Sequence, residues 1–209
     1  MNLDLTQLAA LAAALGWASG LRLYAVLFFT GAAGWLGWVD LPSGLRILES
    51  PWLLGASGVM LVVEFFADKI PGLDTAWDAV HTFIRIPAGA TLAAAVFGGE
   101  QAQWVTVAAL LGGSLAATSH LAKATTRAAA NTSPEPFSNI GLSLLGDSVV
   151  PAALWLSWEY PAAFFFALGV VVVVMLGVIW VLGRFLRGVL SRMRGRAVAP
   201  PDQRLEARS

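Results

Sequence analysis

Long apolar runs separated by short polar segments dominate the chain and predict a bundle of membrane-spanning helices. A helix that crosses the hydrocarbon core of a bilayer needs about 20 apolar residues, each adding about 1.5 Å of rise. We therefore predict an all-α, polytopic transmembrane bundle of about six spans. The predicted spans are residues 21–38, 52–69, 73–99, 104–128, 138–158 and 162–183.

The first apolar run is too long for a single crossing. Residues 5–38 hold one charge, Arg22. As one helix they would reach about 51 Å, well beyond a hydrocarbon core of about 30 Å. The stretch Gly16-Trp-Ala-Ser-Gly20 is the natural place for a break. We expect a broken or re-entrant first helix over residues 5–16, followed by a full span from residue 21.

Two predicted helical hairpins, 52–99 and 105–158, show a faint internal repeat. Transporter folds are often built from such repeats, with the binding site at the interface between them. Leu, Gly, Ala and Ser also coincide easily in apolar helices, so a parallel repeat and a chance match both remain open. The matching strings are Leu53-Leu-Gly-Ala-Ser57 with Leu110-Leu-Gly-Gly-Ser114, and Ile86-Pro-Ala88 with Val150-Pro-Ala152.

Composition supports the membrane assignment and excludes several other classes. Of 209 residues, 57% are hydrophobic and only 12% are charged, whereas soluble domains carry about 25% charge. The 13 basic and 13 acidic residues balance, which argues against the basic surface of a nucleic-acid-binding protein. Because the chain has no cysteine, it has no disulfide framework, thiolate zinc site or cysteine nucleophile.

The basic residues predict an orientation. Residues 1–185 form the predicted transmembrane domain, and residues 186–209 form a basic tail that we expect to be disordered. Threading the spans back from this tail leaves only Arg46 on the opposite side. Because basic residues concentrate in cytoplasmic segments, this asymmetry predicts a multi-pass protein of the inner membrane with a cytoplasmic C-terminus.

Ionisable residues inside the predicted spans are the strongest functional candidates. Each costs roughly 2.5–3.5 kcal/mol to insert, so such residues pair, line water or bind a ligand. At about 100° per residue, the ionisable residues of 73–99 share one helix face, and those of 104–128 share another. The candidate substrate-binding or ion-binding residues are Glu64, Asp68, Asp78, His81, Arg85, His120, Lys123, Arg127 and Asp147.

The acidic and basic groups suggest different ligands. Carboxylates with a histidine suit a divalent cation or a proton relay. The basic face of 104–128 suits an anion or a phosphate head group, and the two faces could also neutralise each other. A divalent cation is the one cofactor that this pattern suggests, and its candidate ligands are Glu64, Asp68, Asp78 and His81.

Simpler interpretations stand beside these. Asp74 follows Pro71-Gly72 and fits a helix N-cap. Arg85 and Lys123 could extend to the lipid head groups as topology markers. Glu64, Asp78 and His81 have no such simple explanation.

No motif identifies an enzyme, because nucleotide-binding and hydrolase signatures are absent from the sequence. Our leading hypothesis is a small transporter or channel-like protein for an ion or small solute. Three alternatives remain open: binding or translocation of a phosphate-bearing lipid, a metal-dependent membrane enzyme, and a structural assembly factor. The expected partners are the lipid bilayer and a small ion or lipid head group, and a homo-oligomer is left open.

Six short strings together resemble one protein family. Over roughly residues 15–185, the chain resembles a bacterial polytopic integral-membrane family catalogued as a domain of unknown function. The resemblance implies a polytopic helical protein and brings no established activity or ligand. The strings are Ala18-Ser-Gly-Leu-Arg-Leu-Tyr24, Glu64-Phe-Phe-Ala-Asp-Lys-Ile-Pro71, Trp77-Asp-Ala-Val-His81, Ile84-Arg-Ile-Pro-Ala-Gly89, Ser119-His-Leu-Ala-Lys123 and Asn131-Thr-Ser-Pro-Glu-Pro-Phe-Ser-Asn139.

Overall fold

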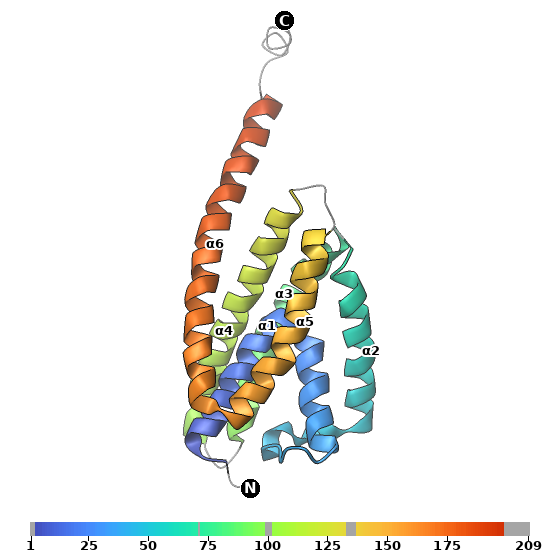
Figure 1. Cartoon of the computed structure of the whole chain (residues 1–209), viewed down its shortest axis with the longest axis vertical. Helices are drawn as coiled ribbons and strands as arrows, with labels where there is room; N and C mark the ends of the chain where they lie inside the picture. The colour runs from blue at the N-terminus through green and yellow to red at the C-terminus, as the bar shows by residue number, and fades with distance from the viewer. Residues whose placement is uncertain (1–2, 71, 99–101, 133–136, 199–209) are drawn as a thin grey trace, which may run out of the picture.

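The computed structural model describes residues 3–70, 72–98, 102–132 and 137–198, and every regular element within these ranges is helical. This confirms the predicted all-α bundle, which is drawn in Figure 1. In chain order the elements are α1 (Leu5–Trp35), the 3-10 helix η1 (Ser43–Glu49), α2 (Pro51–Ala67), α3 (Leu73–Phe97), α4 (Ala102–Ala130), α5 (Phe137–Glu159) and α6 (Pro161–Val198).

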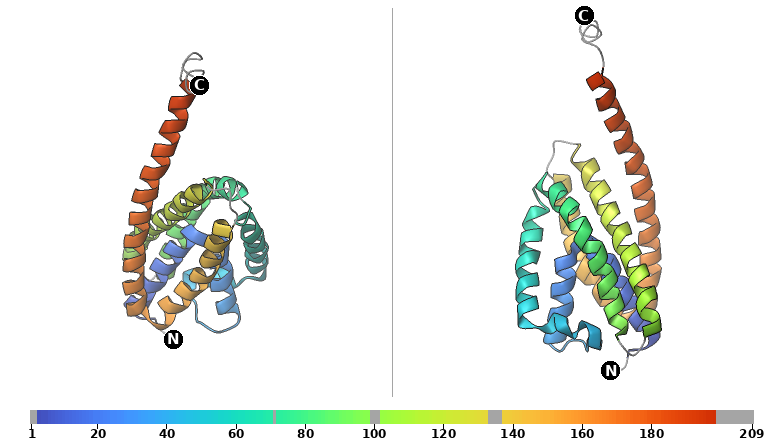
Figure 2. Two further views of the ribbon diagram at one scale, coloured as in Figure 1. Left: turned by 45° about the horizontal axis from the view of Figure 1, so that its top comes forward. Right: turned by 180° about the vertical axis from the view of Figure 1, so that it is seen from behind.

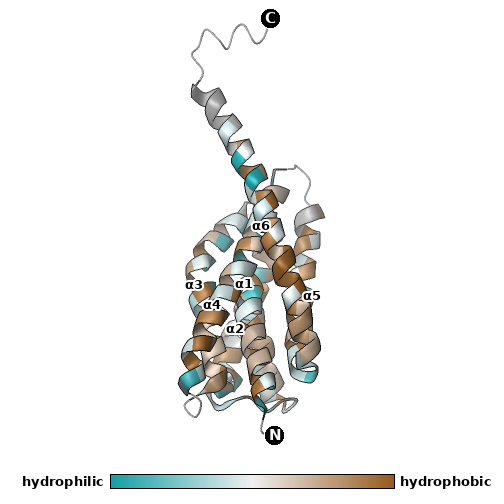
Figure 3. Ribbon diagram, turned by 90° about the vertical axis from the view of Figure 1, so that its left-hand side faces the viewer, coloured by the Kyte–Doolittle hydropathy of each residue, from teal (hydrophilic) through white to brown (hydrophobic). Residues whose placement is uncertain are grey.

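Five helices in the described part of the chain are long and apolar enough to cross a bilayer, namely α1, α3, α4, α5 and α6. The pair formed by η1 and α2, bent by 69°, passes the same test when taken together. Large apolar side chains such as Val63, Leu144 and Val173 are exposed on the outside of the bundle. Figure 3 shows this apolar character along the helices. The chain is therefore a multi-pass membrane protein.

Local sequence sets the helix starts. The Asp4 carboxylate accepts the backbone N–H of Gln7 at 2.7 Å, and the Gln7 side chain accepts the N–H of Asp4, which caps α1. Ser50 caps α2, with Pro51 at the first helical position. Between α2 and α3, Gly72 has a φ of +86°, a conformation that favours glycine. This turn brings the end of α2 close to the start of α3.

Helix α1 folds back on itself at Arg22. This residue has φ −147° and ψ 80°, outside the helical region, and divides α1 into limbs of residues 5–21 and 23–35. The first limb runs alongside α4 in the same direction. Gly16 lies against Gly112, and Gly20 lies one turn further on against Ala116.

The second limb of α1 runs in the opposite direction, back toward the side from which the chain came. Phe28 contacts Gly58, and Gly31 contacts Leu54, so this limb is antiparallel to α2. Helices α2 and α4 point the same way, as Figures 1 and 2 show. Helix α1 therefore begins and ends on one side of the bundle. We call this the N side, and the opposite side, where α2, α4 and α6 end, the C side.

The predicted position of the break was wrong, and residues 21–38 do not form a crossing of their own. Gly16 and Gly20 lie inside a helical limb, where they allow close contact with α4. A Cβ on Gly20 would collide with the carbonyl oxygen of Ala116 and the hydroxyl of Ser119. Small residues are used in this way where membrane helices approach closely. The break lies instead at Arg22, the one charged residue of the segment.

Helix α1 forms the buried centre of the bundle. Leu15, Ala18 and Val26 are completely buried. Helices α2 and α3 form one hairpin and α4 and α5 another, and the two run in parallel directions (Figure 1), as the predicted repeat requires. In both hairpins each helix contacts α1 much more than it contacts its own partner. The two limbs of α1, together with the extensive contact between α3 and α4, thus join the hairpins into one unit.

Helix α6 continues past the predicted end of the transmembrane domain. The helix extends to Val198, and residues 199–209 of the predicted tail lie outside the described part, so the disorder expected there stays a prediction. At about 1.5 Å per residue, the 38 residues of α6 measure about 57 Å, roughly twice the hydrocarbon thickness. The end of α6 therefore projects beyond the rest of the bundle, as Figure 1 shows.

Because the chain has no cysteine, single cysteines can report the side on which each segment lies. Thr6 and Ser43, near the two ends of α1, and Ser191, near the end of α6, are all exposed. We expect Thr6→Cys and Ser43→Cys to react with a membrane-impermeant maleimide from the same side of sealed vesicles, and Ser191→Cys from the other. Labelling of Thr6→Cys and Ser43→Cys from opposite sides would contradict the re-entrant path of α1.

Candidate functional site

Charged side chains from five helices meet around the bend of α1, in the half of the bundle nearer the C side. We call these residues the ion-pair network. Within the described residues, the network contains five carboxylates and five cations, so its formal charge is zero. Its members are Glu64, Asp68, Asp74, Asp78 and Asp147, together with Arg22, Lys69, Arg85, Lys123 and Arg127.

Arg22 holds the bend of α1 against α2 and α5. Its Nη1 atom lies 2.8 Å from Oδ2 of Asp68, just after α2, and its Nη2 atom lies 2.9 Å from Oδ1 of Asp147 in α5. Nη2 also donates to the carbonyl oxygen and hydroxyl of Ser143, at 3.0 and 2.8 Å. The side chain is 1% exposed. The guanidinium is therefore neutralised inside the protein.

Asp68 is the carboxylate on which three cations converge. Besides Arg22, the ammonium group of Lys123 lies 3.0 Å from Oδ2 of Asp68, and Nη2 of Arg127 lies 3.2 Å from it. Lys123 also donates to the carbonyl oxygen of Leu21 at 3.1 Å, immediately before the bend. These contacts tie α4 to both α1 and the end of α2.

Arg85 joins the carboxylates of α2 and α3. Its Nη2 atom pairs with Oε1 of Glu64, and its Nη1 atom lies 2.7 Å from Oδ1 of Asp78. Arg85 and Glu64 are both completely buried. Lys123 lies 3.1 Å from the same Asp78 oxygen. Arg85 and Lys123 thus point into the network, not toward the lipid head groups as the simpler interpretation held.

The pairing leaves some buried atoms without a hydrogen bond in the described part of the protein. Within the network, these atoms are Oε2 of Glu64, Oδ2 of Asp78, Nε of Arg85 and Nη1 of Arg22. Oδ2 of Asp78 lies 3.9 Å from Nε of Arg127, beyond hydrogen-bonding distance. A buried carboxylate oxygen that lacks a donor is a site at which a carboxylate can take up a proton.

Two histidines flank the charged groups, and each bonds to a hydroxyl of a neighbouring residue. Nδ1 of His81 donates to the carbonyl oxygen of Trp77 at 2.8 Å, and Nε2 lies 3.2 Å from the Tyr24 hydroxyl. Nε2 of His120 lies 2.7 Å from the hydroxyl of Thr82, and Nδ1 lies 3.4 Å from Nη1 of Arg85.

Asp74 binds backbone N–H groups at the start of α3 and also belongs to the network. Its Oδ1 atom accepts the backbone N–H groups of Gly72 and Thr75, at 2.9 and 2.6 Å, at the start of α3. Its Oδ2 atom lies 3.4 Å from Nη1 of Arg127. Asn131 donates to both carboxylate oxygens at 3.3 Å. The N-cap position of α3 is held by Gly72, so Asp74 is not the N-cap residue considered from sequence. Asp74 lies in the first turn of the helix, and its side chain also binds α4.

Lys69 and Asp147 form the partly exposed edge of the network, with side chains about one fifth exposed. Their charged atoms lie 3.4 Å apart, and the Lys69 ammonium also lies 3.0 Å from the centre of the Phe65 ring. Burial lowers the pKa of Lys69, and the attraction of Asp147 opposes this effect. This edge is where the network approaches the surface on the C side.

The structure brings the nine residues predicted from sequence into one region. Eight of them, Glu64, Asp68, Asp78, Arg85, His120, Lys123, Arg127 and Asp147, are linked through direct contacts and Arg22. His81 lies on α3 between Asp78 and Arg85 and bonds instead to Tyr24. Their use as a substrate-binding or ion-binding site stays a prediction.

The arrangement does not favour the metal site considered from sequence. In the described residues, no group of three or more histidine and carboxylate side chains is placed to hold a metal ion. Asp68 faces three cations, Glu64 and Asp78 share Arg85, and His81 faces Tyr24. The carboxylates are thus neutralised by guanidinium and ammonium groups.

Sequence reasoning left three network members off the list of candidate site residues, namely Arg22, Lys69 and Asp74. A signal for Arg22 was available, because it is the single charge in an otherwise apolar run of residues 5–38. Lys69 and Asp74 flank the turn between α2 and α3, where a charge is usual at a helix end.

The comparisons with known proteins place the chain in a family. A family model described as a domain of unknown function, DUF4126, matches residues 9–183. The chain belongs to the DUF4126 family. The DUF4126 match includes every member of the ion-pair network and confirms the resemblance found in the sequence. We found no match among curated proteins or among solved structures.

Breaking the central pair should strongly destabilise this DUF4126 protein. We expect Arg85→Met to lower the free energy of unfolding by about 3–5 kcal/mol, because Glu64 would keep a buried charge without its partner, and Asp78 would keep only Lys123 as a close one. Denaturant unfolding in detergent measures the change. Arg46→Met, on the exposed surface of η1, is the control and should leave stability unchanged. Equal stability of the two variants would show that Arg85 is not needed to neutralise the network.

Proposed function

We propose that the protein is a small transporter in which the ion-pair network takes up protons and controls the position of the α1 bend. The observation that carries the proposal is a buried network of zero formal charge closed around the bend of a re-entrant helix. Non-helical backbone at membrane depth is tolerated only where protein or a water-filled cavity surrounds it. Transporters use such broken helices to form their binding sites.

Stability alone does not account for the charges of the network, seven of which are buried. Replacing a buried ion pair by well-packed apolar residues is often neutral or stabilising. A membrane helix bundle could also pack through small and apolar residues, as α1 and α4 do here. The network also connects helices that otherwise touch little, such as α2 with α3 through Glu64 and Arg85. Such connections can be released without disrupting a packed interface.

Protonation provides the means of release. When Oε2 of Glu64 takes up a proton, the carboxylate becomes neutral and its attraction to Arg85 weakens. Protonation of Asp68 would weaken its hold on Arg22 in the same way and leave the bend of α1 held by Asp147 and Ser143 of α5. Each proton taken up leaves the network with one more positive charge. A bound anion would neutralise that charge, so the proposed reaction is proton-coupled movement of an anionic solute.

We place the C side in the cytoplasm and the protein in the inner membrane of a bacterial cell. Lys69, Arg184 and Arg187 lie toward the C side, whereas Arg46 lies on the N side in η1. We expect Ser43→Cys to react with an inner-membrane-impermeant maleimide in intact cells, and Ser191→Cys to react only after lysis. The reverse pattern would invert the assignment.

Proton movement tests the transport proposal. The purified protein is reconstituted in liposomes of bacterial total lipid extract that enclose a pH-sensitive dye, with phosphate outside, and an acidic step is applied outside. We expect proton entry at least tenfold faster than in protein-free liposomes, because Glu64 can carry protons into the network. Glu64→Gln should reduce the rate to the protein-free level.

Glu49→Gln is the matched control, since Glu49 lies in η1 on the N side and outside the network. It should conduct protons like the wild type. Equal rates for the wild type and Glu64→Gln, or no proton entry with the wild type, would contradict the proposal. Size-exclusion profiles before reconstitution separate loss of transport from loss of folding.

A further inference from the structure

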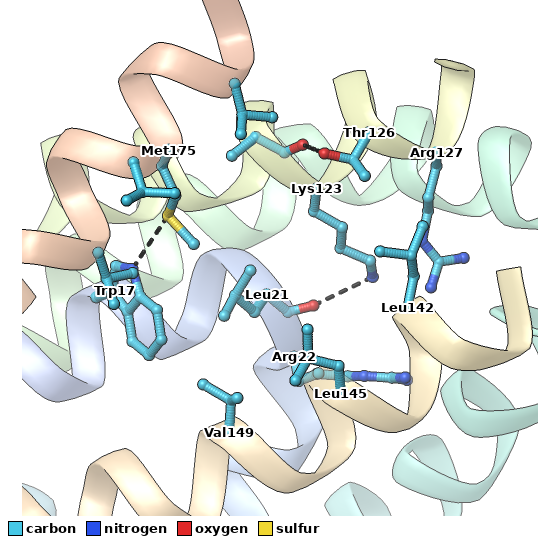
Figure 4. A pocket seen from close by; sticks show the side chains of 15 residues that line it. Trp17, Leu21, Arg22, Lys123, Thr126, Arg127, Leu142, Leu145, Val149 and Met175 are labelled. Carbon is cyan, nitrogen blue, oxygen red and sulfur yellow. Dashed lines mark hydrogen bonds between the residues drawn. The ribbon is translucent and has the colours of Figure 1, made fainter. Parts of the chain in front are cut away.

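An apolar groove runs along α5 and α6 and ends at the basic residues of the network. Its wider part is a cavity of about 310 Å³ between α1, α4, α5 and α6, shown in Figure 4. Apart from three cations and Thr126, all side chains that line it are apolar or glycine. On one wall the Trp17 indole donates a hydrogen bond to the sulfur of Met175, at 3.4 Å, which links α1 to α6.

The groove continues toward the N side as a second cavity of about 190 Å³. The two cavities share Trp17, Val149 and Val171 in their linings, so they adjoin. On α5 the lining extends from Leu142 to Leu156. At about 1.5 Å per residue this is about 21 Å, more than the depth of one leaflet of a hydrocarbon core about 30 Å thick. The groove is therefore long enough for an acyl chain.

The charged end of the groove is basic on the side that faces the cavity. Arg22, Lys123 and Arg127 line the cavity, whereas no carboxylate of the network does. Asp68, which all three cations share, is completely buried behind them. Figure 4 shows Arg22 from α1 and both α4 cations gathered at one end of the groove. Charge complementarity thus favours a negatively charged occupant at this end.

The order of basic and apolar residues matches a lipid in the leaflet on the C side. Arg127 lies three residues before the end of α4, and Lys123 lies about one turn deeper. The apolar lining of α5 then leads away from these cations toward the bilayer centre and the N side. A phospholipid of that leaflet has its phosphate and its acyl chains in the same order.

We propose that this groove binds a phosphate-bearing lipid from the leaflet on the C side. Its phosphate lies at Arg127 and Lys123, and one acyl chain extends along α5 past Val149. The inference rests on the proposed transport function, because it names the anionic substrate of the same site. The lipid phosphate supplies the negative charge that the network needs after it takes up a proton.

Native mass spectrometry of the purified protein in detergent tests the proposal. The probes are dioleoylphosphatidylglycerol, dioleoylglycerol with the same chains but no phosphate, and inorganic phosphate alone. We expect one phosphatidylglycerol to bind at least tenfold more tightly than dioleoylglycerol, and phosphate alone not to bind. Arg127→Gln should reduce this preference severalfold, because it removes a cation from the groove.

Filling the groove should prevent binding. Gly146 lines the cavity, and a Cβ there would make only ordinary contact with Nε of Arg22, so Gly146→Phe can enter the space. Gly141→Phe is the matched control, because Gly141 lies on the same helix with open space around it. A second pair of variants tests the same point without changing a glycine. Leu145→Trp fills the cavity, because Leu145 lines it, and Leu144→Trp is the control, because the adjacent Leu144 does not line the cavity.

Each outcome decides the proposal. Loss of phosphatidylglycerol in Gly146→Phe or Leu145→Trp, with binding kept in the two controls, supports it. Equal binding of the two lipids, unchanged binding in both groove variants, or binding of inorganic phosphate alone would overturn it. The binding measurement involves no proton gradient, so it is independent of the transport assay. Lipid binding without proton movement would support the groove site and contradict the transport proposal.

Discussion

The neutralisation of Arg22 inside the bundle is the constraint on which the arrangement of the other helices depends. A guanidinium cannot lose its charge, and at the bend of a re-entrant helix it has no route along its own helix to water. Oppositely charged groups must therefore come to it, and they do so from the end of α2 and from α5. Asp68 then has two further cations on α4, and Arg85 extends the pairing to Glu64.

Close packing and charge pairing act on different parts of α1. Its first limb has glycines at the contact with α4, so the two backbones approach closely, and the hydroxyl of Ser119 donates to the Trp17 carbonyl at 2.6 Å. Only beyond this contact does the helix break. The packing positions the bend, and the charges decide what surrounds it. Because α1 contacts both hairpins, a change at the bend alters the contacts of α2, α3, α4 and α5 together.

Most of the correct predictions about the helices and their polar faces came from helical periodicity. It identified the helices and placed Asp78, His81 and Arg85 on one face of α3, because such a pattern depends only on spacing along one helix. The pairing of Arg22 with Asp147 depends on tertiary structure, which spacing does not contain. The break was predicted at Gly16 and Gly20 instead of Arg22, because glycine is common both at helix breaks and at close helix contacts. Carboxylates near a histidine likewise fit both a metal site and an ion-pair network.

The equal number of positive and negative charges has a consequence for the response to membrane voltage. An elementary charge that crosses the whole membrane gains or loses about 2.3 kcal/mol per 100 mV. If the network moved as one unit, its five cations and five carboxylates would move no net charge, and voltage would do no work on it. If the α1 bend moved alone, Arg22 would carry one positive charge through part of the electric field. The sensitivity of the protein to voltage therefore depends on whether the bend moves with its partners or away from them.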